Sequence, residues 1–283
     1  MILAALHVYP VKSCRGIAVT SWPLDAFGLA GDRAWMVVDE HGRFLTQREE
    51  PKLALVATRF VAPDGKDARS GVVLSAPGRA ELRLPPACAA EGDREIEVWR
   101  HRGPAVDAGD EAAAWISSHL GRPARVVALP RGHRRPVNPD WYPGHAQAAF
   151  ADAYPLLLIG EASLDDLNAR LARPLPMERF RPNLVIRGAA PYAEDRWKRI
   201  CIGDVELEIV KPCARCVITT TEQSTGERDG NEPLATLATY RKTGLGVVFG
   251  QNAVHLERGT LEVGAPVEVL ETRETLRERA GMD

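Results

Sequence analysis

The sequence predicts a mainly β fold with a few helices, a β-rich α+β protein built from two β-barrel lobes. Short runs of β-branched and aromatic residues, separated by Gly, Pro and Asp, fill the first ~100 residues, and this pattern is typical of barrels and sandwiches. The length of 283 residues fits two lobes better than one small core. Apolar residues make up 45% and charged residues 26%, which excludes a disordered chain or a membrane protein.

The first lobe is predicted to consist of strands and one helix. The first ten residues are expected to form a strand. Further strands are predicted at residues 34–38, 43–46, 53–61, 71–74 and 95–99. A helix is predicted to open at Asp107 or Asp110, because an apolar face follows, and to stop at Gly121 and Pro123.

A loop rich in Pro, Arg, His and Asn at residues 130–139 is predicted to link the lobes or to form a mobile cover. We therefore expect an N-terminal β-barrel domain at residues 1–128, a second β-barrel domain at residues 129–272, and a polar tail at residues 273–283.

The second lobe is predicted to mix strands with two helices. Ser163, with Asp166 three residues later, predicts a capped helix start. A short helix is predicted at residues 232–240. Strands are predicted at residues 155–159, 183–186, 199–202 and 205–210, and again from Val247. The glycines of residues 244–250 have the wrong spacing for a dinucleotide loop and are expected to open a hairpin.

Charge and targeting signals limit the partners and the compartment. The 36 basic and 38 acidic side chains nearly cancel, which argues against nucleic acid or an anionic membrane as a partner. The N-terminus lacks the basic region of a secretory signal, and no apolar run approaches ~18 residues. Five irregularly spaced cysteines predict free thiols in a reducing compartment. We expect a cytoplasmic protein with no membrane segment.

The most informative stretch is Cys213-Ala214-Arg215-Cys216, which follows a predicted strand. One C-x-x-C alone is a weak zinc signal, because structural zinc takes four ligands. A redox dithiol would need a helix N-terminus, whereas residues 217–220 are predicted to continue as extended β-branched chain. The alternative without a functional role is that both thiols are buried and only fill space in the core. Lys211 and Arg215 favour a thiolate, which is the form that binds a soft metal.

Two polar segments of the first lobe could bind an anion. Lys12 and Ser13 end the first strand, and Gly16 permits a tight turn there, so a lysine, a hydroxyl and free backbone N–H groups come together. Arg33 follows Gly31-Asp32 and could clamp a phosphate. A solvated loop and a surface ion pair are the alternatives.

Two segments of the second lobe carry similar groups. Arg181 and Asn183 alternate onto one side of an extended segment. Asp152 precedes an apolar strand, where it could deliver a proton or cap a turn. Solvated charge and turn capping are the alternatives.

Taken together, these motifs resemble the MOSC-domain family, named for the C-terminal domain of molybdenum cofactor sulfurase, and within it the amidoxime-reducing branch and its bacterial relatives. The resemblance covers nearly the whole chain in order. The matching segments are YPVKSCRG at 9–16, GDRAWMVVDEHGRFLTQRE at 31–49, FADAYPLLLIGEASLDDLN at 150–168, RFRPNLVI at 179–186, residues 193–241 around KPCARC, and FGQN at 249–252.

The resemblance implies a molybdopterin-type molybdenum cofactor held between the lobes. Cys216 would then be the metal ligand and Asp152 a catalytic carboxylate near the metal, whereas Cys213 matches a position that is not the ligand. The residues that would hold the pterin and phosphate are Lys12, Ser13, Arg33, Arg181, Asn183 and Arg215.

The implied activity is that of a molybdenum-dependent reductase, which would remove oxygen from small N-hydroxylated compounds in a two-electron step. Because the chain carries no ferredoxin-type cysteine cluster, electrons are expected from a separate flavoprotein, ferredoxin or cytochrome b5-type protein. The alternative is a sulfur carrier or cofactor-delivery protein, in which Cys216 carries a persulfide without turnover.

Overall fold

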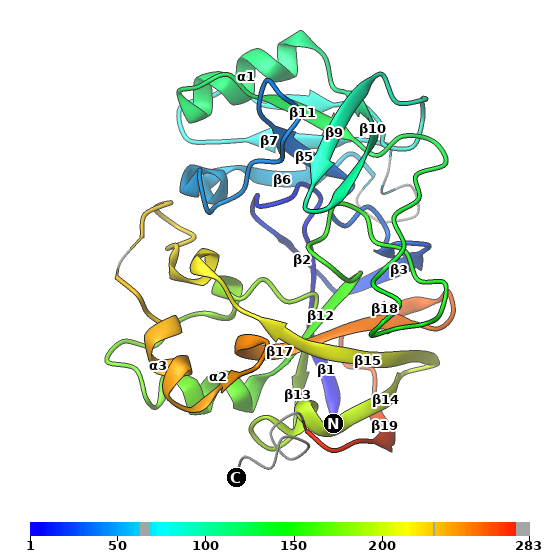
Figure 1. The fold of residues 1–283 in the computed structure, drawn as a ribbon, viewed down its shortest axis with the longest axis vertical. Helices are drawn as coiled ribbons and strands as arrows, with labels where there is room; N and C mark the ends of the chain where they lie inside the picture. Colours follow the sequence, from blue (N-terminus) through cyan, green and yellow to red (C-terminus); the bar gives the residue numbers. More distant parts are fainter. Residues whose placement is uncertain (63–67, 69, 229, 276–283) are drawn as a thin grey trace.

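In the computed structural model, which describes residues 1–62, 68, 70–228 and 230–275, an upper and a lower lobe meet along a set of loops (Figure 1). The predicted mainly β class is confirmed. No helix within the described ranges is long and apolar enough to cross a membrane.

The lower lobe is built around one large mixed sheet that uses both ends of the chain. In order across the sheet, its strands are β19 (Val267–Thr272), β14 (Trp197–Ile202), β15 (Val205–Ala214), β17 (Gly246–His255), β12 (Leu156–Gly160), β13 (Leu184–Arg187), β1 (Ile2–Val8) and β2 (Ile17–Val19). Short β16 (Lys242–Thr243) pairs with β17 and forms the expected glycine hairpin. β1 and β2 come from the predicted N-terminal domain, yet they belong to this sheet of the lower lobe. The predicted domain boundary at residue 128 stays a prediction.

One parallel pair sets the geometry of the site. β12 and β13 run parallel, with Leu158 opposite Leu184, and the crossover between them contains α2 (Glu161–Asn168) and a 3-10 turn at Met177–Arg179. β1 runs antiparallel to β13, with Leu6 opposite Leu184. The end of β1 and the starts of β12 and β13 therefore lie at the same edge of the sheet.

The upper lobe combines two smaller sheets with a helix. One sheet orders β5 (Trp35–Val38), β11 (Arg125–Ala128), β10 (His101–Asp107) and β9 (Arg94–Val98). The other orders β6 (Ala57–Phe60), β7 (Val72–Ser75) and β8 (Leu82–Leu84). The predicted helix is confirmed as α1 (Asp110–Leu120), which packs on β11 and ends at Gly121 in a left-handed conformation (Figure 1).

Smaller elements connect the two lobes. β18 (Thr260–Glu262), from late in the chain, pairs with β3 (Ser21–Asp25), which pairs in turn with β4 (Gly28–Leu29). The short helix predicted at residues 232–240 is present as α3 (Leu234–Tyr240), which packs against β17 in the lower lobe.

Some local predictions are wrong. Residues 43–46 form isolated bridges instead of a strand, because Phe44 and Arg43 pair singly with Val38 and Glu97. The predicted strand at 53–61 begins as a 3-10 helix (Pro51–Leu55), because Pro51 fixes its first turn. Residue 163 does not cap α2.

The start of α2 differs because of a buried carboxylate. The helix begins after Gly160, and the Ser163 hydroxyl lies inside the first turn, where it donates to Oε1 of Glu194 at 2.7 Å. Ser163 Oγ also accepts the backbone N–H of Tyr192 at 2.8 Å. The serine is therefore taken up by tertiary contacts that the local sequence does not reveal.

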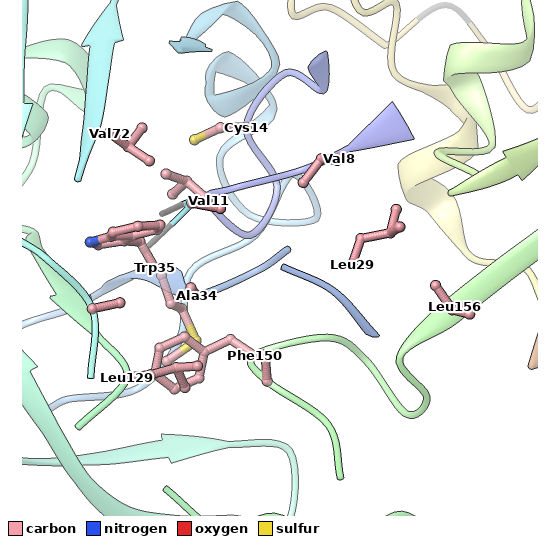
Figure 2. Close-up of a cluster of buried hydrophobic side chains, with 14 of the residues drawn as sticks. Val8, Val11, Cys14, Leu29, Ala34, Trp35, Val72, Leu129, Phe150 and Leu156 are labelled. Carbon is pink, nitrogen blue, oxygen red and sulfur yellow. The ribbon is translucent and has the colours of Figure 1, made fainter. Parts of the chain in front are cut away.

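A continuous apolar core runs under the loops at which the lobes meet. Figure 2 shows Val11, Cys14 and Trp35 in this core, with Phe150 from the second half of the chain in the same cluster; all four are fully buried. Val11 and Cys14 flank Lys12 and Ser13 in the sequence. The core therefore anchors on both sides the loop that carries these two polar residues.

Candidate functional site

A pocket that opens to solvent lies between the loops of the two lobes. The structure brings every predicted site residue to this pocket, although they come from five separate segments. The lining includes Lys12, Ser13, Arg33, Asp152, Arg181, Asn183, Arg215 and Cys216.

The sheet explains how such distant residues meet. Lys12 and Ser13 follow β1, Asp152 precedes β12, and Arg181 and Asn183 precede β13. Because these strand ends lie at one edge of the sheet, the side chains converge there.

Several residues at the pocket have strained backbone. Ser13, Arg33 and Arg181 have φ values of 67°, 48° and 55°, in the left-handed region that side chains other than Gly and Asn rarely adopt. Such strain costs of order 1–3 kcal/mol per residue and gathers at binding and catalytic sites. The strained backbone therefore supports a binding or catalytic role for these three residues.

Cys216 lies just past the end of β15, where the pairing of β15 with β17 shifts register between Pro212 and Ala214. A 3-10 helix, Val217–Thr220, begins directly after Cys216, so the predicted extended continuation is wrong. Thr219 closes this turn by donating its hydroxyl to the Cys216 carbonyl at 2.9 Å. The bulge and the turn together direct Cys216 into the pocket.

The two thiols of the C-x-x-C motif have different neighbours. Arg215 Nη1 donates to Sγ of Cys213 at 3.2 Å, and its Nη2 donates to the Phe180 carbonyl at 2.7 Å. Sγ of Cys216 instead accepts a hydrogen bond from Nη2 of Arg48 at 3.3 Å. The motif is therefore asymmetric, with each sulfur facing a different guanidinium group.

The pocket is strongly cationic. Five basic side chains line it, Lys12, Arg33, Arg48, Arg181 and Arg215, against the single carboxylate of Asp152. Burial lowers the pKa of Lys12 to about 8, although Asp152 opposes this shift. Burial likewise lowers the pKa of Arg181 to about 10. An anionic ligand would relieve the repulsion among these charges.

Asp152 lies at the mouth of the pocket, with 56% of its side chain exposed and protein on its remaining sides. Burial acts to raise its pKa, but Lys12 and then Arg48 outweigh burial and hold the pKa well below the usual range. The Asp152 side chain forms an ion pair with Lys12, lies 3.5 Å from Nη2 of Arg48, and accepts from the indole of Trp99 at 3.3 Å. Asp152 is therefore ionised at neutral pH.

Asn183 is held by contacts within the protein. Its amide donates to the His7 carbonyl and to Asp32, each at 3.1 Å. Its oxygen accepts from Leu157 N at 3.2 Å and from Arg33 Nη1 at 3.1 Å. Asn183 lines the pocket, but these four bonds fix it as a brace for Arg33, and its role toward a ligand stays a prediction.

Sequence reasoning missed Arg48, which lines the pocket, and Arg135, which holds the loop that carries Asp152. Arg48 was within reach, because it belongs to the segment 31–49 that carries the family resemblance. Arg135 is buried within the predicted linker and donates to the carbonyls of Ala149, Ala151 and Asp152 at 2.7, 2.6 and 3.1 Å. No local pattern distinguishes it from Arg134, which is exposed.

Fold and site together define a two-lobed β protein with a thiol in the wall of a cationic pocket. Comparison with known families matches residues 1–123 to the MOSC N-terminal beta barrel domain and residues 145–268 to the MOSC domain. The chain belongs to the MOSC-domain family.

Named relatives match over most of the chain. Mitochondrial amidoxime-reducing component 1 of Homo sapiens is 38% identical over 288 residues, covering 95% of this chain and 82% of that protein. Mitochondrial amidoxime reducing component 2 of Homo sapiens is 34% identical, covering 94% and 82%. Molybdenum cofactor sulfurase of Oryza sativa subsp. japonica is 34% identical, covering 88% of this chain and 32% of that protein.

Proposed function

We propose that this protein binds a molybdopterin-type molybdenum cofactor in the pocket and uses it to reduce N-hydroxylated compounds. The observation that carries the proposal is the location of Cys216, whose soft sulfur donor lies in a pocket lined by five cationic side chains. The names of the relatives, which refer to amidoxime reduction and to the molybdenum cofactor, agree with this function.

The donor set fits such a cofactor. Phosphate and dithiolene groups are anionic, and the pocket has five cations against one carboxylate. Arg215 Nε is buried and has no hydrogen-bond partner among the described residues, so a donor is left for a ligand. We assign Lys12, Ser13, Arg33, Arg181 and Arg215 to holding the cofactor, Asn183 to bracing Arg33 beside it, and Cys216 to ligating the metal.

When bound, the cofactor supplies two-electron oxygen-atom chemistry. For an N-hydroxyamidine, the N–O bond breaks, two electrons and two protons are consumed, and an amidine and water are released. Asp152 accepts hydrogen bonds from the substrate, because its depressed pKa keeps it ionised. Lys12 Nζ, with a pKa near 8, can hold a proton beside Asp152 and deliver it near neutral pH.

The electrons are proposed to come from a separate flavoprotein, ferredoxin or cytochrome b5-type protein. The cytoplasmic location stays a prediction.

The test is reduction of N-hydroxybenzamidine with a chemical electron donor, by protein made in a host that synthesises molybdopterin. We expect benzamidine to accumulate with the wild-type protein and not with Cys216→Ala. If the protein is instead a sulfur carrier, the wild-type protein should lack molybdenum and turnover, and it should release sulfur to cyanide. Activity that persists in Cys216→Ala would contradict the ligand assignment.

A further inference from the structure

The guanidinium of Arg48 lies at the meeting point of the two groups proposed to act in the reaction. Its Nη2 is 3.3 Å from Sγ of Cys216 and 3.5 Å from Oδ2 of Asp152. The loop that carries Arg48 belongs to the first half of the chain, whereas both contacted residues belong to the second half. The arginine therefore reaches across the mouth of the pocket to the sulfur.

Arg48 differs from Arg33 and Arg181 in what its side chain contacts. Arg33 is bonded to Asp32 and Asn183, at 2.5 and 3.1 Å. Arg181 donates to the buried carbonyl of Cys14 at 2.7 Å. Those two guanidinium groups are held by buried groups of the scaffold. Arg48 has one long scaffold contact, from its Nη1 to Oγ1 of Thr46 at 3.4 Å, and its Nη2 contacts Cys216 and Asp152, which line the pocket.

Trp99 holds Arg48 from the side. The guanidinium carbon of Arg48 lies 4.7 Å from the centroid of the Trp99 ring, a cation–π contact, while the indole N–H donates to Asp152 at 3.3 Å. Phe44 packs against the indole with ring centroids 5.1 Å apart.

A tight hairpin turn presents Trp99 at the pocket. Trp99 lies in the turn between β9 and β10, keeps 40% of its surface exposed, and has a φ of 57°. Two-residue hairpin turns favour a positive φ, so this tight turn presents the indole beside Arg48 and Asp152.

We propose that Arg48 contacts the oxygen of the substrate's N–O group next to Cys216, and that Trp99 is the positioning residue that fixes Arg48 there. This inference rests on the proposed function and names the group that recognises the oxygen. The guanidinium presents N–H donors beside the sulfur, and an N-hydroxyl oxygen is an acceptor that the reduced product lacks. Arg48 therefore distinguishes the N-hydroxylated substrate from the amine or amidine product.

The test measures binding without turnover. Oxidised, molybdenum-loaded protein without an electron donor is titrated by calorimetry with N-hydroxybenzamidine and, separately, with benzamidine, which lacks the oxygen. We expect the wild-type protein to bind the N-hydroxylated compound more tightly than benzamidine. In Arg48→Ala the ratio of the two dissociation constants should fall roughly 10- to 100-fold, which is the effect of losing one hydrogen bond from a charged donor. Arg48→Lys should recover part of the loss. Molybdenum content should remain that of the wild type.

Trp99 variants provide an independent arm should Arg48→Ala fail to fold. Trp99→Leu should lose part of the preference and Trp99→Phe should keep it, because phenylalanine retains an aromatic face. Arg102→Ala is the matched control, since Arg102 lies on the same hairpin and, among the residues that the structure describes, pairs at the surface with Glu97. It should bind both compounds like the wild type.

The outcomes separate this inference from the proposed function. An active wild-type protein whose Arg48→Ala and Trp99→Leu variants keep the full preference would overturn the role of Arg48 alone. A molybdenum-loaded wild-type protein that neither binds nor reduces N-hydroxybenzamidine would overturn both.

Discussion

The ammonium group of Lys12 forms an ion pair with the carboxylate of Asp152, although the two residues are 140 positions apart. The same ammonium donates to the Phe150 carbonyl at 2.8 Å. Lys12 is almost fully buried, whereas Asp152 opens onto the pocket. The pair therefore ties the loop after β1 to the loop before β12 and gives the pocket a fixed pair of opposite charges.

The buried Lys12 predicts an unusual dependence of stability on pH. Folded Lys12 releases its proton near pH 8, whereas unfolded lysine keeps it until about 10.5. Between these values the unfolded state binds more protons, so the free energy of unfolding rises with pH. Relative to Lys12→Met, the wild-type protein without cofactor should gain about 1–3 kcal/mol between pH 7.5 and pH 10.

Urea unfolding of both proteins at several pH values provides this measurement, and taking the difference cancels the other titrating groups. A difference that stays constant across the range would rule out the buried-charge account.

Arg33 and Arg181 should both be needed to retain the cofactor. Their guanidinium carbons lie 4.4 and 4.3 Å from the centroid of the Tyr9 ring, so one aromatic ring orients both groups. Removing one charged donor to a phosphate weakens binding roughly 10- to 100-fold. Arg33→Ala and Arg181→Ala should therefore lose molybdenum on dialysis faster than the wild-type protein.

Arg59→Ala is the control for these variants, because Arg59 lies outside the pocket lining and, among the described residues, forms an exposed ion pair with Glu81. Equal retention of molybdenum in all four proteins would reject the assignment of Arg33 and Arg181 to the anion site.

Arg135 should stabilise the fold through the loop that carries Asp152. Arg135→Ala leaves the carbonyls of Ala149, Ala151 and Asp152 without their donor, which should cost about 2–4 kcal/mol of unfolding free energy. The exposed neighbour offers a matched control, since Arg134→Ala should change stability by less than about 0.5 kcal/mol. Urea denaturation measures both, and similar effects from the two variants would contradict the anchoring role.

Local sequence predicted those parts of the site that local chemistry defines. Lys12 and Ser13 follow an apolar strand, and Cys216 follows another. The strand pattern and the polar residues at the strand ends were therefore enough to identify them as candidates. The mainly β fold and α1 were likewise encoded by residue pattern and by the glycine that ends the helix.

Contacts between distant segments could not be predicted in this way. Arg48 contacts Cys216, which lies 168 positions later in the sequence. Arg135 donates to carbonyls that are brought together only when the loop before β12 folds. The 3-10 turn after Cys216 was also missed, because its β-branched residues favour strands, whereas tertiary packing buries Thr219 and Thr220 in a turn.

The central claim is that Cys216 ligates molybdenum while Cys213 does not. The most direct measurement is the molybdenum content of purified wild-type protein, Cys216→Ala and Cys213→Ala, all made in a host that synthesises molybdopterin. We predict near-stoichiometric metal in the wild-type protein and in Cys213→Ala, and loss of metal in Cys216→Ala. Metal retained in Cys216→Ala, or absent from the wild-type protein, would contradict the account.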